Sequence, residues 1–261
     1  MAAVLPLDDV PDRSGENSAI RYNCRNVSPA AEPPPLIYTF KESKYSSHSE
    51  VLAQLPGPGN GRRVLDVGCA DGHLAGVLAS RGYAATGIER PGGTGPNFPA
   101  QVVLIAADLE QGLPKLGGQF DIVICADVLE HLRRPDLLLV QLRSVLAPGG
   151  ILIASLPNSG NIYFRLVIVS GRFPQYEKGL FDRTHLRFYT WDGWRALLGS
   201  AGFRIERVRP TGIPVGLACP GYQSSLAVRM AERLCYEIAR LWRALFAYQF
   251  IVTAVPDQPN P

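Results

Sequence analysis

Apolar residues along the middle of the chain follow two alternating patterns. Short runs of about five apolar residues, rich in Val and Ile, are typical of strands covered on both faces of a sheet. Between them, apolar residues recur every three or four positions, as in amphipathic helices. The predicted strands cover residues 63–67, 84–88, 102–106, 120–125 and 150–155, and the predicted helices cover residues 73–81, 128–132 and 136–146. Because strand and helix alternate, the sequence predicts an α/β fold with a parallel sheet.

The remaining residues extend this core on both sides. Further helices are predicted at 47–55, 160–169, 191–200 and 226–246, and further strands at 203–208 and 248–255. The last strand is expected to insert antiparallel to its neighbours. The predicted organisation is a flexible arm over 1–44, one domain over 45–255 with substrate-cap insertions at 157–190 and 211–246, and a tail over 256–261.

The predicted helix over residues 226–246 has a pronounced pattern of its own. One face carries the apolar residues Met230, Leu234, Ile238, Leu241 and Leu245. The opposite face is predicted to carry the arginines Arg229, Arg233, Arg240 and Arg243. Three interpretations are open: the apolar face packs on the domain, the arginine face lies on anionic lipid, or the helix's aromatic residues enclose an apolar substrate. Peripheral membrane contact through residues 226–246 is therefore one expectation.

Composition and charge narrow the range of partners and locations. A net charge of +3 over 261 residues, with no run of Lys and Arg, gives no reason to expect nucleic acid as a partner. The five cysteines are odd in number, scattered and without a C-x-x-C pair, which argues against zinc and against a disulfide framework. No secretory signal and no apolar run of membrane-spanning length is evident, so the cytoplasm is the expected location.

The most informative motif is a strand, a glycine turn and the start of a helix. Residues 64–67 are apolar apart from one acid, and Gly68 and Gly72 follow where a side chain would block close approach of a ligand to the backbone. The next helix directs its N-terminal N–H groups and the positive end of its dipole at this turn. Glu89 ends the following strand, where a carboxylate can accept hydrogen bonds from both hydroxyls of a ribose. The segment predicts a site for a nucleoside cofactor.

The spacing of the turn distinguishes two classes of cofactor. A dinucleotide site requires G-x-G-x-x-G, whereas this chain has Asp66-x-Gly68-x-x-x-Gly72 with a second acid inside the loop. A second carboxylate would repel a pyrophosphate and suits a cationic amino group. The pattern resembles the first motif of class I S-adenosylmethionine-dependent methyltransferases, with Ala70 in place of the middle glycine. The resemblance implies S-adenosyl-L-methionine as the cofactor, bound by Asp66, Gly68, Cys69, Ala70, Asp71, Gly72 and Glu89.

Two later segments resemble the same family in the same order along the chain. Asp108 follows the third strand, where the family's acid binds the adenine amino group and the next N–H, that of Leu109, meets a ring nitrogen; Asp108 could instead serve only as a turn or helix cap. The segment 120–131 resembles the family's fourth strand, and its tip places Asp127 beside the cofactor. The resemblance implies a doubly wound, mostly parallel, seven-stranded Rossmann-like sheet with a helical substrate cap.

Two histidines are candidate catalytic bases. An imidazole titrates near neutral pH, so His131 could take a proton from a substrate hydroxyl, or it could be a structural residue closing a short helix. His185 belongs to residues 181–190, which resemble a substrate-facing block of methyltransferases associated with glycosyl transfer and with lipid or quinone assembly. In that block Arg183 or Arg187 would clamp an anionic group. The alternative is a loop held to the core by salt bridges.

Two weaker resemblances concern a metal and the cofactor's methionine end. Asp127, Glu130 and His131 resemble the E-x-x-E-H segment of ubiquinone-biosynthesis O-methyltransferases, with Asp for the first Glu. Such ligands could hold Mg²⁺ and acidify a phenol, but Glu-His is widespread in relatives without metal, and no metal is predicted. Residues 45–48 resemble a segment that closes over the methionine end of the cofactor, although His48 could equally be a surface residue at a helix start.

The expected function is methyl transfer to a small-molecule acceptor. A substrate hydroxyl oxygen would attack the sulfonium methyl in line, and the protein would mainly align the reactants and exclude water. Sugar, lipid-linked and quinone-like acceptors are all compatible with the sequence. The alternatives are a non-catalytic binding or scaffold protein with this fold, and a protein or nucleic-acid methyltransferase. The chain lacks the Asn/Asp-Pro-Pro-aromatic tetrad typical of enzymes that methylate nucleobase amines. Oligomeric state stays open.

Overall fold

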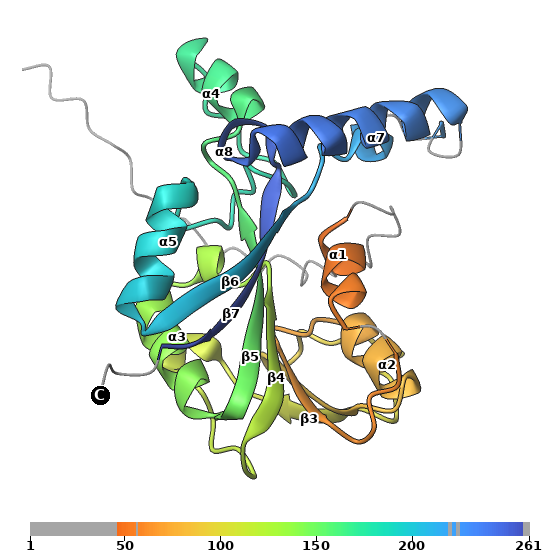
Figure 1. Ribbon diagram of the computed structural model, residues 1–261, viewed down its shortest axis with the longest axis vertical. Coiled ribbons are helices and arrows are strands. Elements are labelled where there is room, and N and C mark those ends of the chain that lie inside the picture. Colours follow the sequence, from red (N-terminus) through yellow and green to blue (C-terminus); the bar gives the residue numbers. More distant parts are fainter. Residues whose placement is uncertain (1–45, 56, 219–220, 223–224, 258–261) are drawn as a thin grey trace, which may run out of the picture. The chain divides into compact units, whose positions relative to one another are not determined.

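The computed structural model describes residues 46–55, 57–218, 221–222 and 225–257 of the 261-residue chain. Its centre is a seven-stranded sheet in the order β3-β2-β1-β4-β5-β7-β6 (Figure 1). The strands are β1 (Arg63–Val67), β2 (Ala84–Glu89), β3 (Val103–Ala106), β4 (Phe120–Ala126), β5 (Leu146–Pro157), β6 (Phe203–Pro210) and β7 (Gln249–Pro256). The predicted arm over 1–44 and the end of the tail over 258–261 lie outside the described residues.

Strand directions confirm the predicted doubly wound, mostly parallel sheet. β1 pairs in parallel with β2 and β4, β2 with β3, and β4 with β5. The last strand, β7, inserts antiparallel between β5 and β6, as the sequence predicts. Strand order reverses at β1 and β4, so the carboxyl ends of these two strands open onto the crevice where ligands bind in sheets of this kind.

Helices cover both faces of the sheet. They are α1 (Ser47–Ala53), α2 (His73–Ser80), α3 (Pro135–Ser144), α4 (Ile162–Val169), α5 (Trp191–Ser200), α6 (Val215–Ala218), α7 (Leu226–Leu241) and α8 (Arg243–Phe246), with single 3₁₀ turns at Leu109–Gln111 and Leu129–His131. In Figure 1, α1 and α2 lie on one face and α3 and α5 on the other. The predicted helices are confirmed in position except at 128–132, where the structure has a 3₁₀ turn, and at 226–246, where the helix is interrupted; α6 and the first 3₁₀ turn were not predicted.

Alternate residues of the central strands bury their side chains on opposite faces, which produces two cores. One core joins Leu65 and Val123 to leucines of α3 and to Trp194 of α5, and the other joins Val64 and Ile122 to α1 and α2. Trp194 is fully buried, and its indole Nε1 donates to the carbonyl of Pro157 at 2.7 Å. This bond satisfies the one polar atom of the indole ring inside the core.

The helix predicted over 226–246 is not continuous, and the exposure of its large apolar residues bears on the three interpretations that the sequence left open. The chain leaves helical geometry at Trp242 (φ −139°, ψ 76°), so α7 and α8 are separate helices. On α7 the side chains of Val228 and Ala239 are buried, whereas those of Met230, Leu234 and Leu241 are exposed. The apolar face therefore does not pack on the domain. At about 100° of rotation per residue, Arg229, Arg233 and Arg240 lie roughly a quarter turn from that face rather than opposite it.

Buried asparagine side chains hold α8 against the start of α4. The Nδ2 of Asn158 donates to the carbonyls of Ala244 and Ala247, and the Nδ2 of Asn161 donates to those of Phe246 and Ala247. Both asparagines are buried, and their side chains supply hydrogen-bond donors to the carbonyl groups at the end of α8, which have no partner within that helix.

Among the helices in the described part of the chain, none has both the length and the apolar character to cross a bilayer.

Candidate active site

A cavity of about 380 Å³ lies at the carboxyl ends of β1, β2 and β4 and beside the segment after β3. Its lining includes nine of the ten predicted cofactor-binding residues, namely Asp66, Gly68, Cys69, Ala70, Asp71, Glu89, Asp108, Leu109 and Asp127. The tenth, Gly72, lies just outside: it precedes α2 with φ +72° and packs against Phe98. The predicted base His131 also lines the cavity, together with His48 and Thr184. Sequence motifs far apart in the chain therefore meet in one place.

The glycine loop has the backbone geometry that its sequence requires. Gly68 has φ +70°, and a Cβ there would lie 2.6 Å from Val128 Cγ2, so a larger residue would clash as well as be strained. Ala70 has φ +48°, a conformation that favours glycine, at the position where the motif has its middle glycine. The N–H of Ala70 donates to Glu89 Oε2 at 2.8 Å. The carboxylate at the tip of β2 is thereby held against the loop.

Three carboxylates converge on this loop, and the most deeply buried is Asp66. Burial raises the pKa of Asp66 to about 7, partly offset by a hydrogen bond from the Ala75 N–H and reinforced by repulsion from Glu89 and Asp71. Its Oδ2 atom is buried and has no hydrogen-bond partner among the described residues. A buried acceptor without a partner is costly unless a ligand supplies a donor. The site therefore fits the ammonium and sulfonium groups of S-adenosylmethionine and disfavours a pyrophosphate.

Asp108 caps a 3₁₀ turn, which is one of the two roles that the sequence left open, and it also lines the cavity. Its Oδ1 accepts a hydrogen bond from the Glu110 N–H at 3.0 Å and so caps the 3₁₀ turn that begins at Leu109. Asp108 and Leu109 both line the cavity, at the end that lies away from Asp127 and His131 in the sheet order. The cap fixes the Asp108 carboxylate beside the start of this turn, and its role in adenine binding stays a prediction.

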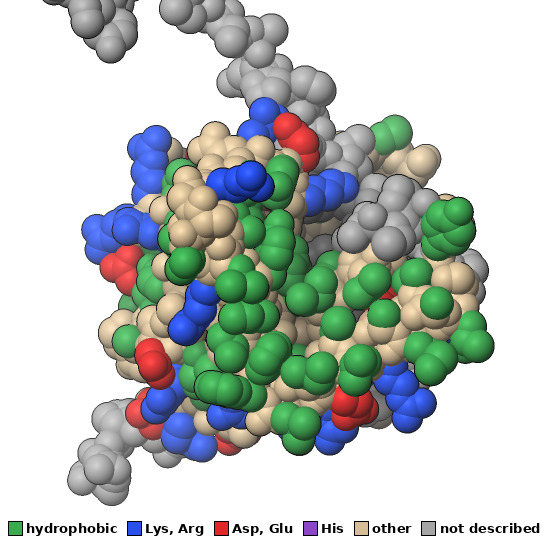
Figure 2. Space-filling model, turned by 90° about the horizontal axis from the view of Figure 1, so that it is seen from above, with side chains coloured by type: hydrophobic (Ala, Val, Ile, Leu, Met, Phe, Trp, Pro, Cys, Tyr) green, Lys and Arg blue, Asp and Glu red, His purple; other side chains and the backbone are tan. Residues whose placement is uncertain are grey.

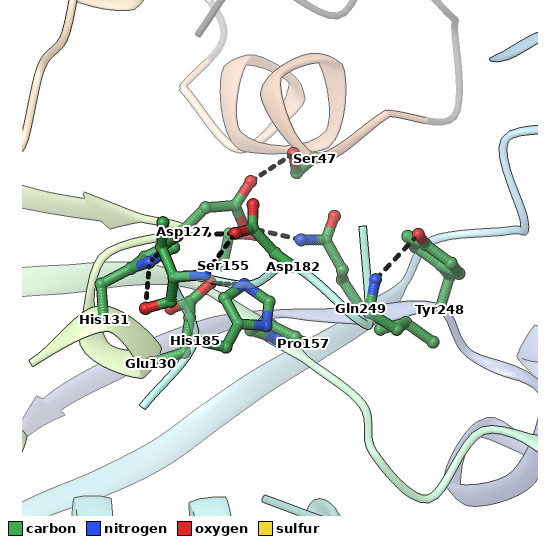
Figure 3. Close-up of polar contacts among 12 residues, drawn as sticks. Ser47, Asp127, Glu130, His131, Ser155, Pro157, Asp182, His185, Tyr248 and Gln249 are labelled. Atoms are coloured by element: carbon green, nitrogen blue, oxygen red, sulfur yellow. Dashed lines mark hydrogen bonds and ion pairs between the residues drawn. The ribbon is translucent and has the colours of Figure 1, made fainter. Parts of the chain in front are cut away.

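At the other end of the cavity, three separate elements bind Asp127 (Figure 3). Its Oδ1 accepts hydrogen bonds from Ser155 Oγ at 2.5 Å and from Gln249 Nε2 at 2.6 Å, and its Oδ2 lies 3.5 Å from Ser47 Oγ of α1. The backbone of Asp127 is in the left-handed region, with φ +56°. Such strain persists when surrounding contacts over-determine it, and it is concentrated at functional sites. No sequence motif predicted that Ser155 or Gln249 belongs to the site.

His131 is held in one tautomer by the segment that follows α4. Its Nδ1 lies 3.2 Å from the carbonyl oxygen of Thr184 and 3.0 Å from Thr184 Oγ1, while Thr184 Oγ1 donates to Asp182 Oδ1 at 2.6 Å. A carbonyl can only accept, so Nδ1 carries the proton and Nε2 carries the lone pair. Burial lowers the pKa of His131 below 6.5, partly opposed by Asp182. The ring is therefore neutral at pH 7 and able to accept a proton.

His185, the second predicted base, lies behind His131. It is absent from the cavity lining, and its ring meets that of His131 edge to face with centroids 4.8 Å apart. Its Nε2 lies 3.8 Å from Glu130 Oε1, and both side chains are buried. Burial, followed by repulsion from His131, lowers the pKa of His185 to about 4. His185 therefore contacts the candidate base rather than the cavity.

The potential metal ligands differ from those that the motif implied. Ligand atoms of Glu130, His131 and His185 lie within 4.8 Å of one another, and these three are a set of described residues that could hold a divalent ion. Asp127 does not belong to this set, and its carboxylate instead accepts hydrogen bonds from Ser155 and Gln249. The fold brings His185 into the place that the E-x-x-E-H resemblance assigned to Asp127.

The two arginines proposed as clamps for an anionic group do not line the cavity. Arg183 forms a salt bridge with Glu177 at 3.0 Å, and Arg187 Nη2 donates to the carbonyl of Arg133 at 2.6 Å. Their observed contacts match the alternative of a loop held by polar bonds. The backbone supports this too, since the N–H groups of Leu186 and Arg187 both donate to the carbonyl of Glu130.

The depressed pKa of His185 predicts a stability that depends on pH. Between pH 6.5 and 4 the unfolded chain binds a proton at this residue that the folded chain excludes, so stability is full above pH 6.5 and falls as the pH falls. At pH 5 the contribution of His185 alone should be a loss of about 2 kcal/mol relative to neutral pH, whereas Asp66, whose pKa is raised by burial, acts in the opposite direction. Urea unfolding of the original protein and of His185→Asn at pH 7.5 and 5.0 measures it, because Asp66 affects both proteins equally and the original protein should lose about 2 kcal/mol more than the variant on going to pH 5.0. An equal pH dependence in both proteins would assign it to other groups.

Comparison with known proteins agrees with this geometry. A family model described as a methyltransferase domain matches residues 40–208. The ubiquinone biosynthesis O-methyltransferase of Dinoroseobacter shibae is 31% identical over 166 residues, which cover 60% of this chain and 65% of the relative. That of Psychrobacter arcticus is 34% identical over 137 residues, covering 48% and 51%. The chain thus spans between about half and 65% of the length of these relatives.

Solved structures share the fold at lower sequence identity. Magnesium protoporphyrin IX methyltransferase from Synechocystis PCC 6803, solved with bound SAH, matches with a TM-score of 0.52 and 22% identity over 80% of each chain. The 1,6-didemethyltoxoflavin-N1-methyltransferase of Burkholderia thailandensis, solved with S-adenosylhomocysteine, matches with a TM-score of 0.51 and 16% identity over 81% of this chain and 77% of that one. The residues matched by the family model include the glycine loop, Glu89, Asp108 and His131. The chain therefore belongs to the class I S-adenosylmethionine-dependent methyltransferases.

Proposed function

We propose that the protein is an O-methyltransferase that transfers the methyl group of S-adenosylmethionine to a hydroxyl of an apolar, quinone-like small molecule. The observation that carries this proposal is His131, which lines the cavity with its proton held on Nδ1 by Thr184 and its lone pair on Nε2. A neutral imidazole there suits removal of a hydroxyl proton. Relatives about 30% identical that are ubiquinone biosynthesis O-methyltransferases support the acceptor class.

The cofactor supplies a methyl group already activated by a positively charged sulfur. In our proposal Glu89 binds the ribose hydroxyls, Asp108 and the Leu109 N–H bind the adenine, and Asp66 accepts a hydrogen bond at the methionine end. These contacts fix the position of the methyl group, and orientation of this kind lowers the barrier of a bimolecular transfer.

Asp127 and His131 perform the acceptor chemistry in this proposal. The His131 Nε2 takes the proton of the attacking hydroxyl as the oxygen–methyl bond forms. Asp127 already accepts hydrogen bonds from Ser155 and Gln249, and we assign it to positioning the acceptor and the methyl group. His185 and Thr184 act through His131: one packs on its ring and the other fixes its tautomer. They are therefore positioning residues.

A methyl-transfer assay with matched acceptors tests the proposal. The full chain is incubated with methyl-labelled S-adenosylmethionine and one of three compounds: a catechol with a prenyl tail, its dimethoxy analogue, or the aniline that replaces each hydroxyl by an amine. We expect label only in the tailed catechol, at a rate abolished by omission of the protein. Labelling of the aniline alone would overturn O-transfer, and saturable cofactor binding without labelling of any hydroxyl compound would favour the non-catalytic alternative.

A further inference from the structure

Helix α7 has an exposed aliphatic face that the proposed reaction does not use. The side chains of Leu226, Met230, Leu234 and Leu241 are between 60% and 88% exposed, while the smaller Val228 and Ala239 are buried against the domain. Amphipathic helices of water-soluble domains ordinarily bury their large aliphatic residues. On this helix the arrangement is reversed, so the large residues are available to contact something outside the domain.

A second set of exposed apolar side chains lies on α4 and the segment after it. These residues are Tyr163, Leu166, Ile168, Val169, Phe173, Tyr176, Leu186 and Phe188. The hydrogen bonds from Asn161 at the start of α4 to Phe246 and Ala247 place α4 beside α8, which directly follows α7. Figure 2 looks onto the end of the domain that carries α4 and α7 and shows hydrophobic side chains spread across it, with Lys and Arg among them. We call these two sets together the apolar end; contiguous exposed apolar areas of this kind mark interaction sites.

The charge of the same segments is strongly positive. Residues 157–190 and 226–246 hold nine Lys and Arg against four Asp and Glu, a net charge of +5, whereas the whole chain has a net charge of +3. Two of the four acids, Glu177 and Glu237, are paired with Arg183 and Arg240 at 3.0 and 2.9 Å. The apolar end is therefore a cationic surface on a chain whose remaining residues sum to a negative charge.

We propose that the apolar end docks on an anionic lipid bilayer. Leu, Met and Phe side chains flanked by arginines are typical of amphipathic helices that lie in the headgroup region. The apolar groups enter the acyl boundary and the arginines bind lipid phosphates. The net positive charge of these segments is complementary to the negative charge of anionic lipid headgroups. Pairing of two copies through the same faces would bring their arginine flanks together and leave most of the positive charge unbalanced.

Docking in this way brings the bilayer to the catalytic cavity. Leu186 and Phe188 of the apolar end flank the segment whose Thr184 lines the cavity and binds His131. An acceptor held in the bilayer by an apolar tail would thus reach His131 along the protein surface without crossing water. This inference concerns where the protein works, and it stands or falls separately from the identity of the acceptor.

Vesicle flotation of the full chain tests the proposal without any acceptor. Vesicles of phosphatidylcholine alone are compared with vesicles containing phosphatidylglycerol, at low and at high salt. We expect flotation with the anionic vesicles only, weakened by high salt. The double variant Leu234→Glu/Leu241→Glu should abolish it, and Arg229→Gln/Arg233→Gln should lower the partition coefficient on the order of 20-fold.

A control variant replaces two exposed apolar residues on another helix. Leu137 and Val140 on α3 are each 51% exposed, so Leu137→Glu/Val140→Glu adds the same charge at a helix away from the apolar end and should float like the original protein. Unchanged circular dichroism and cofactor affinity establish that every variant is folded. Failure of the original protein to float with anionic vesicles overturns the proposal. So does a dimer that becomes a monomer in Leu234→Glu/Leu241→Glu without any vesicle binding, because the face would then be a contact between copies.

Discussion

Replacement of His131 by alanine should lower turnover by about 10²-fold or more while the affinity for S-adenosylmethionine stays unchanged. The imidazole is the group in the cavity whose neutral form, fixed by Thr184, can take a proton at pH 7. Steady-state kinetics with the preferred acceptor and calorimetric titration of the cofactor measure the two quantities. Added imidazole should restore part of the activity in the His131→Ala protein, since it can enter the space that the side chain leaves.

The pH profile gives this prediction a second readout. Protonation of the base stops the reaction, so activity should fall as the pH falls through the pKa of His131. Burial lowers that pKa, so the acid limb of kcat/KM should lie below pH 6.5. His131→Ala should lack this limb. A variant that keeps both its rate and its acid limb would show that a group other than His131 accepts the proton.

Replacement of Glu89 by alanine should weaken S-adenosylmethionine binding by about 100-fold or more. Its carboxylate is the acceptor at the tip of β2, and hydrogen bonds between a charged carboxylate and two ribose hydroxyls contribute about 1.5–3 kcal/mol each. The substitution also removes the acceptor of the Ala70 N–H, 2.8 Å away, which loosens the glycine loop. Calorimetric titration of cofactor into the original protein and the variant measures the effect.

A conservative variant separates the two contributions of Glu89. Glu89→Gln keeps the size of the side chain and an oxygen that can accept from Ala70, but it lacks the negative charge. We expect it to bind with intermediate affinity and to unfold at nearly the same urea concentration as the original protein. Equal and tight binding by all three proteins would contradict the assignment of Glu89 to the ribose.

The cofactor half of the site could be predicted from sequence because it depends on strand ends. Asp66, Glu89 and Asp108 each follow or end an apolar run, and the carboxyl ends of parallel strands necessarily meet at one edge of the sheet. The glycine spacing identifies the loop at the first of these ends. Prediction of the strands therefore placed the three acids together without any knowledge of side-chain contacts.

The acceptor half depends on contacts between distant segments, which local patterns do not encode. Gln249 reaches Asp127 only because β7 inserts antiparallel beside β5 in one particular register. Thr184 reaches His131 because the segment after α4 folds back onto Glu130. The sequence also identified the apolar face of α7 correctly, but periodicity reports that a face is apolar and not whether the domain covers it. That outcome depends on packing, which here favours the smaller Val228 and Ala239.

The position of β7 has a consequence for the order of events during synthesis. The strand is translated last among the described elements, yet it lies between β5 and β6 and supplies Gln249 to Asp127. Until residues 249–256 leave the ribosome, β6 has no neighbour in the sheet and Asp127 lacks one of its hydrogen-bond donors. The nascent chain can thus form the cofactor loop early, but the hydrogen bonds around Asp127 are complete only after β7 has emerged.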